Sequence, residues 1–167
     1  MIYLATDHRG FELKEKIKKW LFEWGFEFED MGAFELNPED DYPDFVHKAA
    51  EKGSQDPDNS RAIILGGSGQ GEAMVANRYK GVRAAVFYGP PFKLLFTIGG
   101  FFAEWNWRGV YSKIIKLSRG HNNANILSLG AFFTEEKSLK KIIKLWLDTP
   151  FSNEERHKRR IEKIENF

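Results

Sequence analysis

Residues 62–72 read "AIILGGSGQGE", an apolar run followed by four glycines within six residues and then by a carboxylate. The apolar run is typical of a strand buried in a parallel sheet. A glycine inside a regular element costs about 0.5–1 kcal/mol relative to alanine, so this cluster indicates a backbone that turns tightly or closely approaches another group. Two interpretations stay open here. One is a strand-to-helix turn, and the other is a loop whose N–H groups bind an anion.

Around this segment, short apolar runs alternate with amphipathic stretches. We expect strands over residues 1–6, 26–30, 61–65, 82–87 and 125–130, and helices over 10–24, 41–53, 72–79, 134–148 and 152–166. The last helix starts with a capping-box pattern, Ser152 followed by Glu155. Strands that alternate with helices of this length predict an α/β fold. We expect a five-stranded, mostly parallel, Rossmann-like sheet with helices on both faces.

Length and composition narrow the class of protein. The chain has 167 residues, enough for a single domain over 1–167, and its 25 basic and 24 acidic residues give a net charge of +1. This balance gives no reason to expect a nucleic acid or a membrane as partner. The absence of cysteine excludes disulfides and thiolate chemistry. We find neither a signal peptide nor an apolar run long enough to span a bilayer, and we expect a cytoplasmic protein.

Several polar segments lie near strand ends, where parallel sheets bind ligands. Asp7 and His8 follow the first strand, and "RGHNNAN" (119–125) precedes the fifth. Arg156 and Arg160 share one face of the last helix. Each segment also has a simpler explanation, as turn chemistry or as a solvated basic face. Taken together with the glycine loop, they lead us to expect one binding site at one end of the sheet.

The glycine loop does not match the familiar phosphate and nucleophile motifs. It ends in Gly71-Glu72, where a Walker loop needs lysine, and the dinucleotide and nucleophile-elbow patterns need glycine at positions 72 and 70. A run of N–H donors at a helix start remains, which suits a carboxylate, a phosphate or a developing oxyanion. Glu72 also has a structural explanation, because the helix dipole favours an acidic first turn by about 0.3–1 kcal/mol.

Five segments together resemble one family, the type B ribose-5-phosphate isomerases and the related galactose-6-phosphate isomerase subunits. They are "TDHRGFELK" (6–14), "DYPDF" (41–45), "GGSGQGE" (66–72) with "ANRYKGVRAA" (76–85), "HNNAN" (121–125) and "ERHKRRIEKI" (155–164). The resemblance implies a three-layer αβα sandwich and an aldose–ketose isomerase of phosphorylated sugars. It also implies homodimers, sometimes tetramers, with active sites shared between subunits, and no metal or other cofactor.

The resemblance also implies roles for individual residues. Glu72 corresponds to the catalytic base, His121 to the residue that opens the sugar ring, and Ser68 to a group that stabilises the enediolate. The substrate-binding positions are Asp7, His8, Gly67, Gly69, Gly71, Asn122, Arg156 and Arg160. Among these, His8 and the two arginines would hold the phosphate, whereas Asp7 and Asn122 would contact sugar hydroxyls.

Two features depart from the family pattern. Phe132 stands where the family usually has an arginine that reaches the phosphate, and residues 90–117 form a longer, aromatic-rich insertion. The insertion could provide extra packing, or a lid or pocket wall with Gly99-Gly100 as a hinge. The sequence therefore favours an isomerase of ribose 5-phosphate and ribulose 5-phosphate or of close relatives. The alternative is a non-catalytic partner subunit or a sugar-phosphate-binding protein with the same fold.

Overall fold

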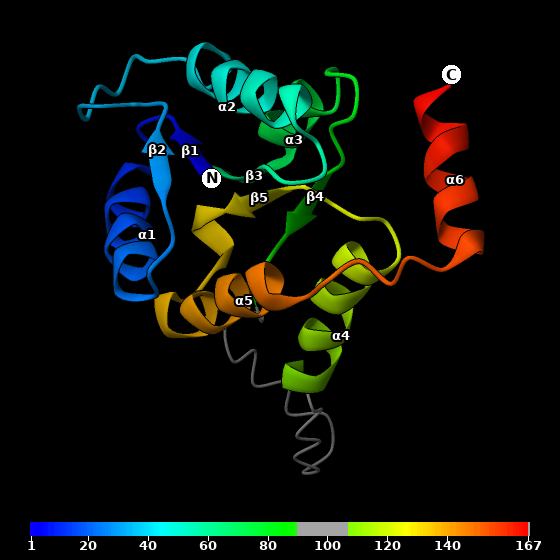
Figure 1. Cartoon of the computed structure of the whole chain (residues 1–167). Helices are drawn as coiled ribbons and strands as arrows, with labels where there is room; N and C mark the ends of the chain where they lie inside the picture. Colours follow the sequence, from blue (N-terminus) through cyan, green and yellow to red (C-terminus); the bar gives the residue numbers. More distant parts are fainter. Residues whose placement is uncertain (90–106, 167) are drawn as a thin grey trace, which may run out of the picture.

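The computed structural model describes residues 1–89 and 107–166. Within these residues the strands form one parallel sheet of five strands in the order β2–β1–β3–β5–β4 (Figure 1). The strands are β1 (Ile2–Thr6), β2 (Phe28–Asp30), β3 (Arg61–Gly66), β4 (Ala84–Phe87) and β5 (Ile126–Gly130). The chain runs from β1 to β2 on one side and then returns to β3 on the other. The crevice between the ends of β1 and β3 is therefore the switch point at which such sheets bind ligands.

Helices cover both faces of the sheet (Figure 1). They are α1 (Phe11–Glu23), α2 (Pro43–Gln55), α3 (Gln70–Ala76), α4 (Trp107–Gly120), α5 (Glu136–Asp148) and α6 (Glu155–Glu165), with a 3₁₀ turn at Ala131–Phe133. Helices α2 and α3 lie on one face, and α1, α4 and α5 lie on the other. The α/β fold with three layers, expected from the alternating pattern, is confirmed.

Alternate residues of β3 divide the core into two clusters. Ile63 and Leu65 pack with residues of α1, α4 and α5, whereas Ile64 packs with residues of α2 such as Val46. All four side chains are fully buried. Burial of an aliphatic side chain of this size stabilises the fold by about 1.5–3 kcal/mol. The continuous apolar run at 62–65 thus forms a strand that is buried on both faces, and it fixes the position of the glycine loop behind it.

The boundaries of some elements differ from those expected. Helix α3 begins at Gln70, two residues early, because Gly69 caps it in the left-handed conformation with φ of 74°. The predicted capping box is wrong, since the N-cap of α6 is Glu154 and the Ser152 hydroxyl pairs with Nδ1 of His157 at 2.8 Å. Helix α4 occupies the last part, residues 107–117, of the segment that we expected to be an insertion. Residues 90–106, including the Gly99-Gly100 hinge, lie outside the described residues.

Helix α6 stands apart from the three layers (Figure 1). Its inner side is fixed to the body of the chain at two places. The ring of His157 lies 4.1 Å from the ring of His121, measured between centroids, and Glu165 forms an ion pair of 2.9 Å with Arg83. Its two arginines of interest, Arg156 and Arg160, are exposed. The helix thus presents a basic face away from its own sheet.

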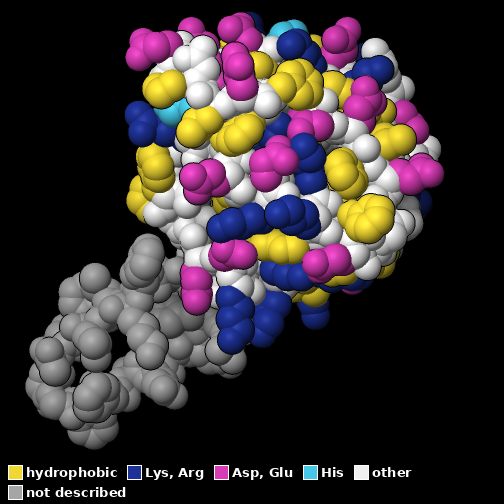
Figure 2. All heavy atoms as spheres, turned by 90° about the vertical axis from the view of Figure 1, so that its left-hand side faces the viewer, with side chains coloured by type: hydrophobic (Ala, Val, Ile, Leu, Met, Phe, Trp, Pro, Cys, Tyr) yellow, Lys and Arg dark blue, Asp and Glu magenta, His cyan; other side chains and the backbone are white. Residues whose placement is uncertain are grey.

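The surface carries no large region of one charge on the side shown in Figure 2, where acidic and basic side chains are interspersed. Hydrophobic side chains lie between them on the same side. This agrees with the net charge of +1. None of the helices in the described residues is long and apolar enough to cross a membrane.

Candidate active site

The turn after β1 brings two polar side chains to the switch point. The Thr6 hydroxyl donates to the carbonyl of Leu65 at 3.0 Å and so ties the end of β1 to the end of β3. A Cβ at Gly10 would lie 2.3 Å from the Thr6 oxygen, so the turn requires glycine there. Asp7 is buried in this turn, and one of its carboxylate oxygens accepts the backbone N–H of Arg9 at 2.9 Å. Asp7 thus lies at the carboxyl end of β1, as its place after the first strand predicted.

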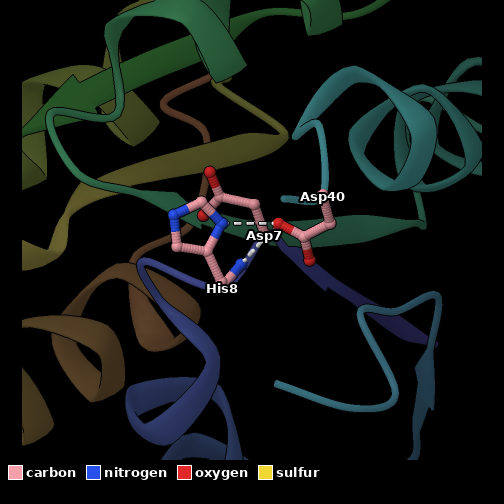
Figure 3. Close-up of side chains that lie close together, drawn as sticks. All are labelled: Asp7, His8 and Asp40. Carbon is pink, nitrogen blue, oxygen red and sulfur yellow. Dashed lines mark hydrogen bonds and ion pairs between the residues drawn. The ribbon is translucent and has the colours of Figure 1, made fainter. Parts of the chain in front are cut away.

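His8 is held by a residue that the sequence analysis missed. Asp40, from the loop before α2, accepts hydrogen bonds from Nδ1 of His8 at 2.6 Å and from the His8 backbone N–H at 3.0 Å (Figure 3). Because a carboxylate accepts here, the proton on Nδ1 is fixed. Nε2 then has no partner among residues 1–89 and 107–166 and can face a ligand. Asp40 stands 32 residues away from His8 in the chain, and its only signal was its place beside "DYPDF".

The glycine loop fits closely around its neighbours. A Cβ at Gly66 would lie 1.5 Å from Oε1 of Glu72, so only glycine leaves room for that carboxylate. Gly69 has a φ of 74°, and its carbonyl accepts the hydroxyl of Ser128 at 2.6 Å. Ser68, half-buried in the loop, accepts the backbone N–H of Gln70 at 3.3 Å. The glycines therefore both shape the turn and admit the glutamate to the end of β3.

This fit makes Gly66→Ala a specific test of the glutamate's position. The added methyl group must displace the carboxylate of Glu72. Because the resemblance predicts that Glu72 is the catalytic base, and catalytic groups tolerate little misplacement, we expect at least about a tenfold loss of turnover. Gly53→Ala in α2 is the matched control, because its Cβ would make only ordinary contacts, at 3.5 Å or more, with Ile126. Steady-state kinetics of both variants measure the effect. Equal activity in the two variants would show that turnover does not depend on the position of the Glu72 carboxylate.

The environment of Glu72 makes its side chain a weaker acid than an exposed glutamate. Its side chain is buried, and this burial raises its pKa above the ordinary value for glutamate. The nearby carboxylate of Asp7 raises the pKa of Glu72 further. Burial also raises the pKa of Asp7, although its hydrogen bond from Arg9 partly offsets this. Two buried carboxylates with raised pKa values at a switch point are typical of a catalytic site.

The raised pKa of Glu72 has a consequence for stability. A folded-state pKa above the unfolded value means that the protonated carboxyl group stabilises the folded protein. This stabilisation is lost as pH rises through the folded pKa. Glu72→Gln keeps the shape and removes the charge, so we expect the variant to be more stable than the wild type at pH 8. Each 1 kcal/mol raises Tm by about 2–4 °C in a chain of this size. Thermal unfolding at pH 8 and at pH 4 checks this, and the difference must shrink at the lower pH.

Two aromatic residues contact the glycine loop. A Cβ at Gly71 would lie 2.6 Å from the hydroxyl oxygen of Tyr42, and one at Gly67 would lie 2.8 Å from the ring of Phe132. The backbone N–H of Phe132 donates to the carbonyl of Gly67 at 3.2 Å. Tyr42 lies in the segment "DYPDF" but was not assigned a role from the sequence. The loop is thus enclosed between a phenol and a half-exposed phenyl ring.

The other predicted site residues do not lie near Glu72 and the glycine loop within one chain. His121 and Asn122 precede β5, so they lie at the amino edge of the parallel sheet, opposite to the glycine loop. Arg156 and Arg160 project from α6, which contacts His121 through His157. The expectation that all these segments meet at one end of one sheet is therefore wrong for a single chain. The described residues form two groups, one around Glu72 and one around His121.

The first group also contains donor atoms that could hold a metal ion. Ligand atoms of Asp7, His8 and Asp40 lie within 4.8 Å of one another. Hydrogen bonds already account for this arrangement, because His8 donates to Asp40 and Asp7 accepts from Arg9. The close approach of these residues thus has an explanation without a metal.

Comparisons with known proteins agree with these observations. A family model described as Ribose/Galactose Isomerase matches residues 2–91 and 110–164. A ribose-5-phosphate isomerase B of Mycolicibacterium paratuberculosis is 34% identical over 166 residues, which cover 99% of this chain and 90% of the relative. A probable ribose-5-phosphate isomerase B of Mycoplasma pneumoniae is 34% identical over 163 residues, covering 98% of this chain and 91% of the relative.

The chain is also similar to solved structures of ribose-5-phosphate isomerase B. The crystal structure of ribose-5-phosphate isomerase B from Mycoplasma genitalium with bound ribulose-5-phosphate superimposes with a TM-score of 0.82 at 33% identity. The match covers 99% of this chain and 93% of that chain. A ribose 5-phosphate isomerase from Thermotoga maritima superimposes with a TM-score of 0.79 at 35% identity, covering 99% and 97%.

Proposed function

The chain belongs to the ribose/galactose isomerase family, and from this we propose that it interconverts ribose 5-phosphate and ribulose 5-phosphate. It is an enzyme, a sugar-phosphate aldose–ketose isomerase. The relatives at about 33% identity over nearly the full chain are named for this reaction, which favours it over a non-catalytic partner subunit. The observation that carries the chemistry is the buried carboxylate of Glu72, accommodated by Gly66 at the end of β3.

Glu72 acts as the single base. Its ionised carboxylate takes the proton from C2 of the open-chain aldose. The electron pair of that C–H bond forms the C1–C2 double bond of a cis-enediolate, and the π pair of the C1 carbonyl moves onto O1. The same carboxyl group then gives its proton to C1, while the hydroxyl proton on O2 passes to O1 and O2 becomes the carbonyl oxygen. A carboxylate performs both steps well when burial brings its pKa closer to the working pH. Its raised pKa supports this role.

The glycine loop stabilises the enediolate. Negative charge develops on the oxygens of C1 and C2, and preorganised N–H and O–H donors are the groups that stabilise such charge best. Ser68 and the backbone of Gly67 and Gly69 lie in the loop between β3 and α3, and Gly71 lies in the first turn of α3. The close contacts of Gly67 and Gly71 with Phe132 and Tyr42 keep this loop in one place. Asp7, next to Glu72, is suited to accept hydrogen bonds from sugar hydroxyls.

The second group of residues completes the site from another subunit. His121 would open the sugar ring by proton transfer, Asn122 would contact a hydroxyl, and Arg156 and Arg160 would bind the phosphate together with His8. Their distance from Glu72 within one chain, and the exposed basic face of α6, support a homodimer, or a tetramer of such dimers, with shared sites. Guanidinium groups bind phosphate through paired hydrogen bonds, which suits the two arginines.

The choice of sugar depends on parts of the chain that differ from the family pattern. An aromatic-rich insertion over 90–117 stays a prediction, as do its roles in packing or as a lid, and the family match omits residues 92–109. The cytoplasmic location also stays a prediction. We propose no metal or other cofactor.

A panel of aldose and ketose phosphates of five and six carbons, each followed by NMR, tests the proposed substrate. Turnover of another sugar phosphate in preference to ribose 5-phosphate would reassign it.

A further inference from the structure

The side chain of Arg9 lies over the ring of Phe132, at the edge of the sheet that holds Asp7 and the glycine loop. The central carbon of the guanidinium is 5.6 Å from the centroid of the ring. The ring in turn lies against Gly67, where a Cβ would be 2.8 Å away, and the Phe132 N–H donates to the Gly67 carbonyl. Arg9, Phe132 and Gly67 thus form a stack that reaches from the β1–α1 turn to the loop that carries Glu72.

The guanidinium of Arg9 is available to a ligand. Among residues 1–89 and 107–166 no carboxylate pairs with it and no acceptor takes a hydrogen bond from it, although its backbone N–H is bound to Asp7. Arg83 differs, because its side chain is occupied by Glu165 and by backbone carbonyls. Arg9 is exposed, so it offers all its donors on the open side of the stack.

The charges around the site explain why a free guanidinium matters there. Asp7 and Glu72 are buried carboxylates, and both repel an anionic substrate. His8 and Arg9 are adjacent in the chain and are the basic residues of this turn. The contact with the Phe132 ring favours positions of the guanidinium close to the glycine loop. An anion that binds beside His8 therefore meets a second cation there.

We propose that Arg9, positioned by Phe132, binds the phosphate group of the substrate on the same side as His8. This rests on the proposed function, because the phosphate is the anionic group of that substrate. Arg9 then supplies from the β1–α1 turn the guanidinium that Phe132 does not supply after β5. Phe132 is a positioning residue in this arrangement and makes no hydrogen bond to the phosphate itself.

Two measurements test the role of Arg9. Calorimetric titration with inorganic phosphate gives its affinity, and kinetics with ribose 5-phosphate separate KM from kcat. For Arg9→Ala we expect phosphate affinity to fall and KM to rise by about ten- to a hundredfold, the effect of losing a hydrogen bond to a charged group. Turnover at saturating substrate should change less than about threefold, because the phosphate does not react. Phe132→Leu removes the stacking surface and should weaken phosphate binding by about two- to fivefold.

Arg78→Ala is the matched control, since Arg78 is an exposed arginine at the end of α3. It removes the same charge and should leave both constants unchanged. The proposal is overturned if Arg9→Ala weakens phosphate binding no more than Arg78→Ala, or if it lowers kcat and leaves KM unchanged. The titration does not depend on turnover. A wild-type protein that binds phosphate through Arg9 but does not convert ribose 5-phosphate would overturn the proposed function and retain the phosphate site.

Discussion

Glu72→Gln is expected to lower the turnover of ribose 5-phosphate by about 10²- to 10⁴-fold, the range for loss of a general base. Glutamine has the shape of glutamate and fits the space left by Gly66, but its amide cannot accept the proton from C2. Substrate affinity should change little, because the phosphate and the hydroxyls are bound by other residues. The loss should therefore fall on kcat, with KM nearly constant.

The measurement is steady-state kinetics with ribose 5-phosphate over a range of pH. In the wild type, kcat/KM should fall on the acid side at a higher pH than an exposed glutamate would give, because burial raises the pKa of Glu72. Glu51→Gln is the matched control, since Glu51 is exposed on α2. Turnover in Glu72→Gln close to that of this control would remove Glu72 from the role of base.

A mixture of two inactive variants should recover activity. The double variant Arg156→Ala, Arg160→Ala is expected to lose at least about 10²-fold in kcat/KM, because two hydrogen bonds to a charged group are lost. If each site takes Glu72 from one subunit and the arginines from the other, a mixed dimer with the Glu72→Gln variant has one intact site. Random exchange of subunits then restores about a quarter of the wild-type activity, since half of the dimers are mixed.

The control for this experiment mixes Glu72→Gln with Gly66→Ala. Both changes affect the same group of residues, so every site in a mixed dimer carries one of them, and mixing should add no activity to that of the separate variants. Subunits must be exchanged by mild denaturation and refolding, and light scattering reports the dimer. If the first mixture stays as inactive as the second, Glu72 and the two arginines do not form a shared site of this kind.

The alternating pattern of the sequence predicted most of the fold. Each of the five expected strands is present, because a strand buried on both faces needs a short apolar run such as the one at 62–65. Helix α4 (Trp107–Gly120) was missed. Most of its residues belong to the aromatic-rich segment 90–117, which was interpreted from its composition. The amphipathic spacing at the end of that segment was not used to predict a helix.

The candidate site was predicted only in part. The place of Glu72 follows from local sequence, because a glycine loop after a buried strand leads to the switch point. The hydrogen bond between His8 and Asp40 depends on how the loop before α2 returns to the end of β1. The residues next to either side chain in the sequence do not predict this contact. The contact of Arg9 with Phe132 depends on the pairing of strands in the same way. His121 was placed with the wrong group, although its position before β5 already put it at the amino edge.

The central claim is that Glu72 moves a proton between C1 and C2 of ribose 5-phosphate. NMR of ribose 5-phosphate incubated with the enzyme in deuterium oxide tests it most directly. The account predicts that ribulose 5-phosphate forms, that deuterium enters C1 of the ketose and C2 of the aldose as equilibrium is approached, and that Glu72→Gln suppresses both processes together. Conversion at the wild-type rate in Glu72→Gln, or deuterium uptake that persists in Glu72→Gln, would contradict it.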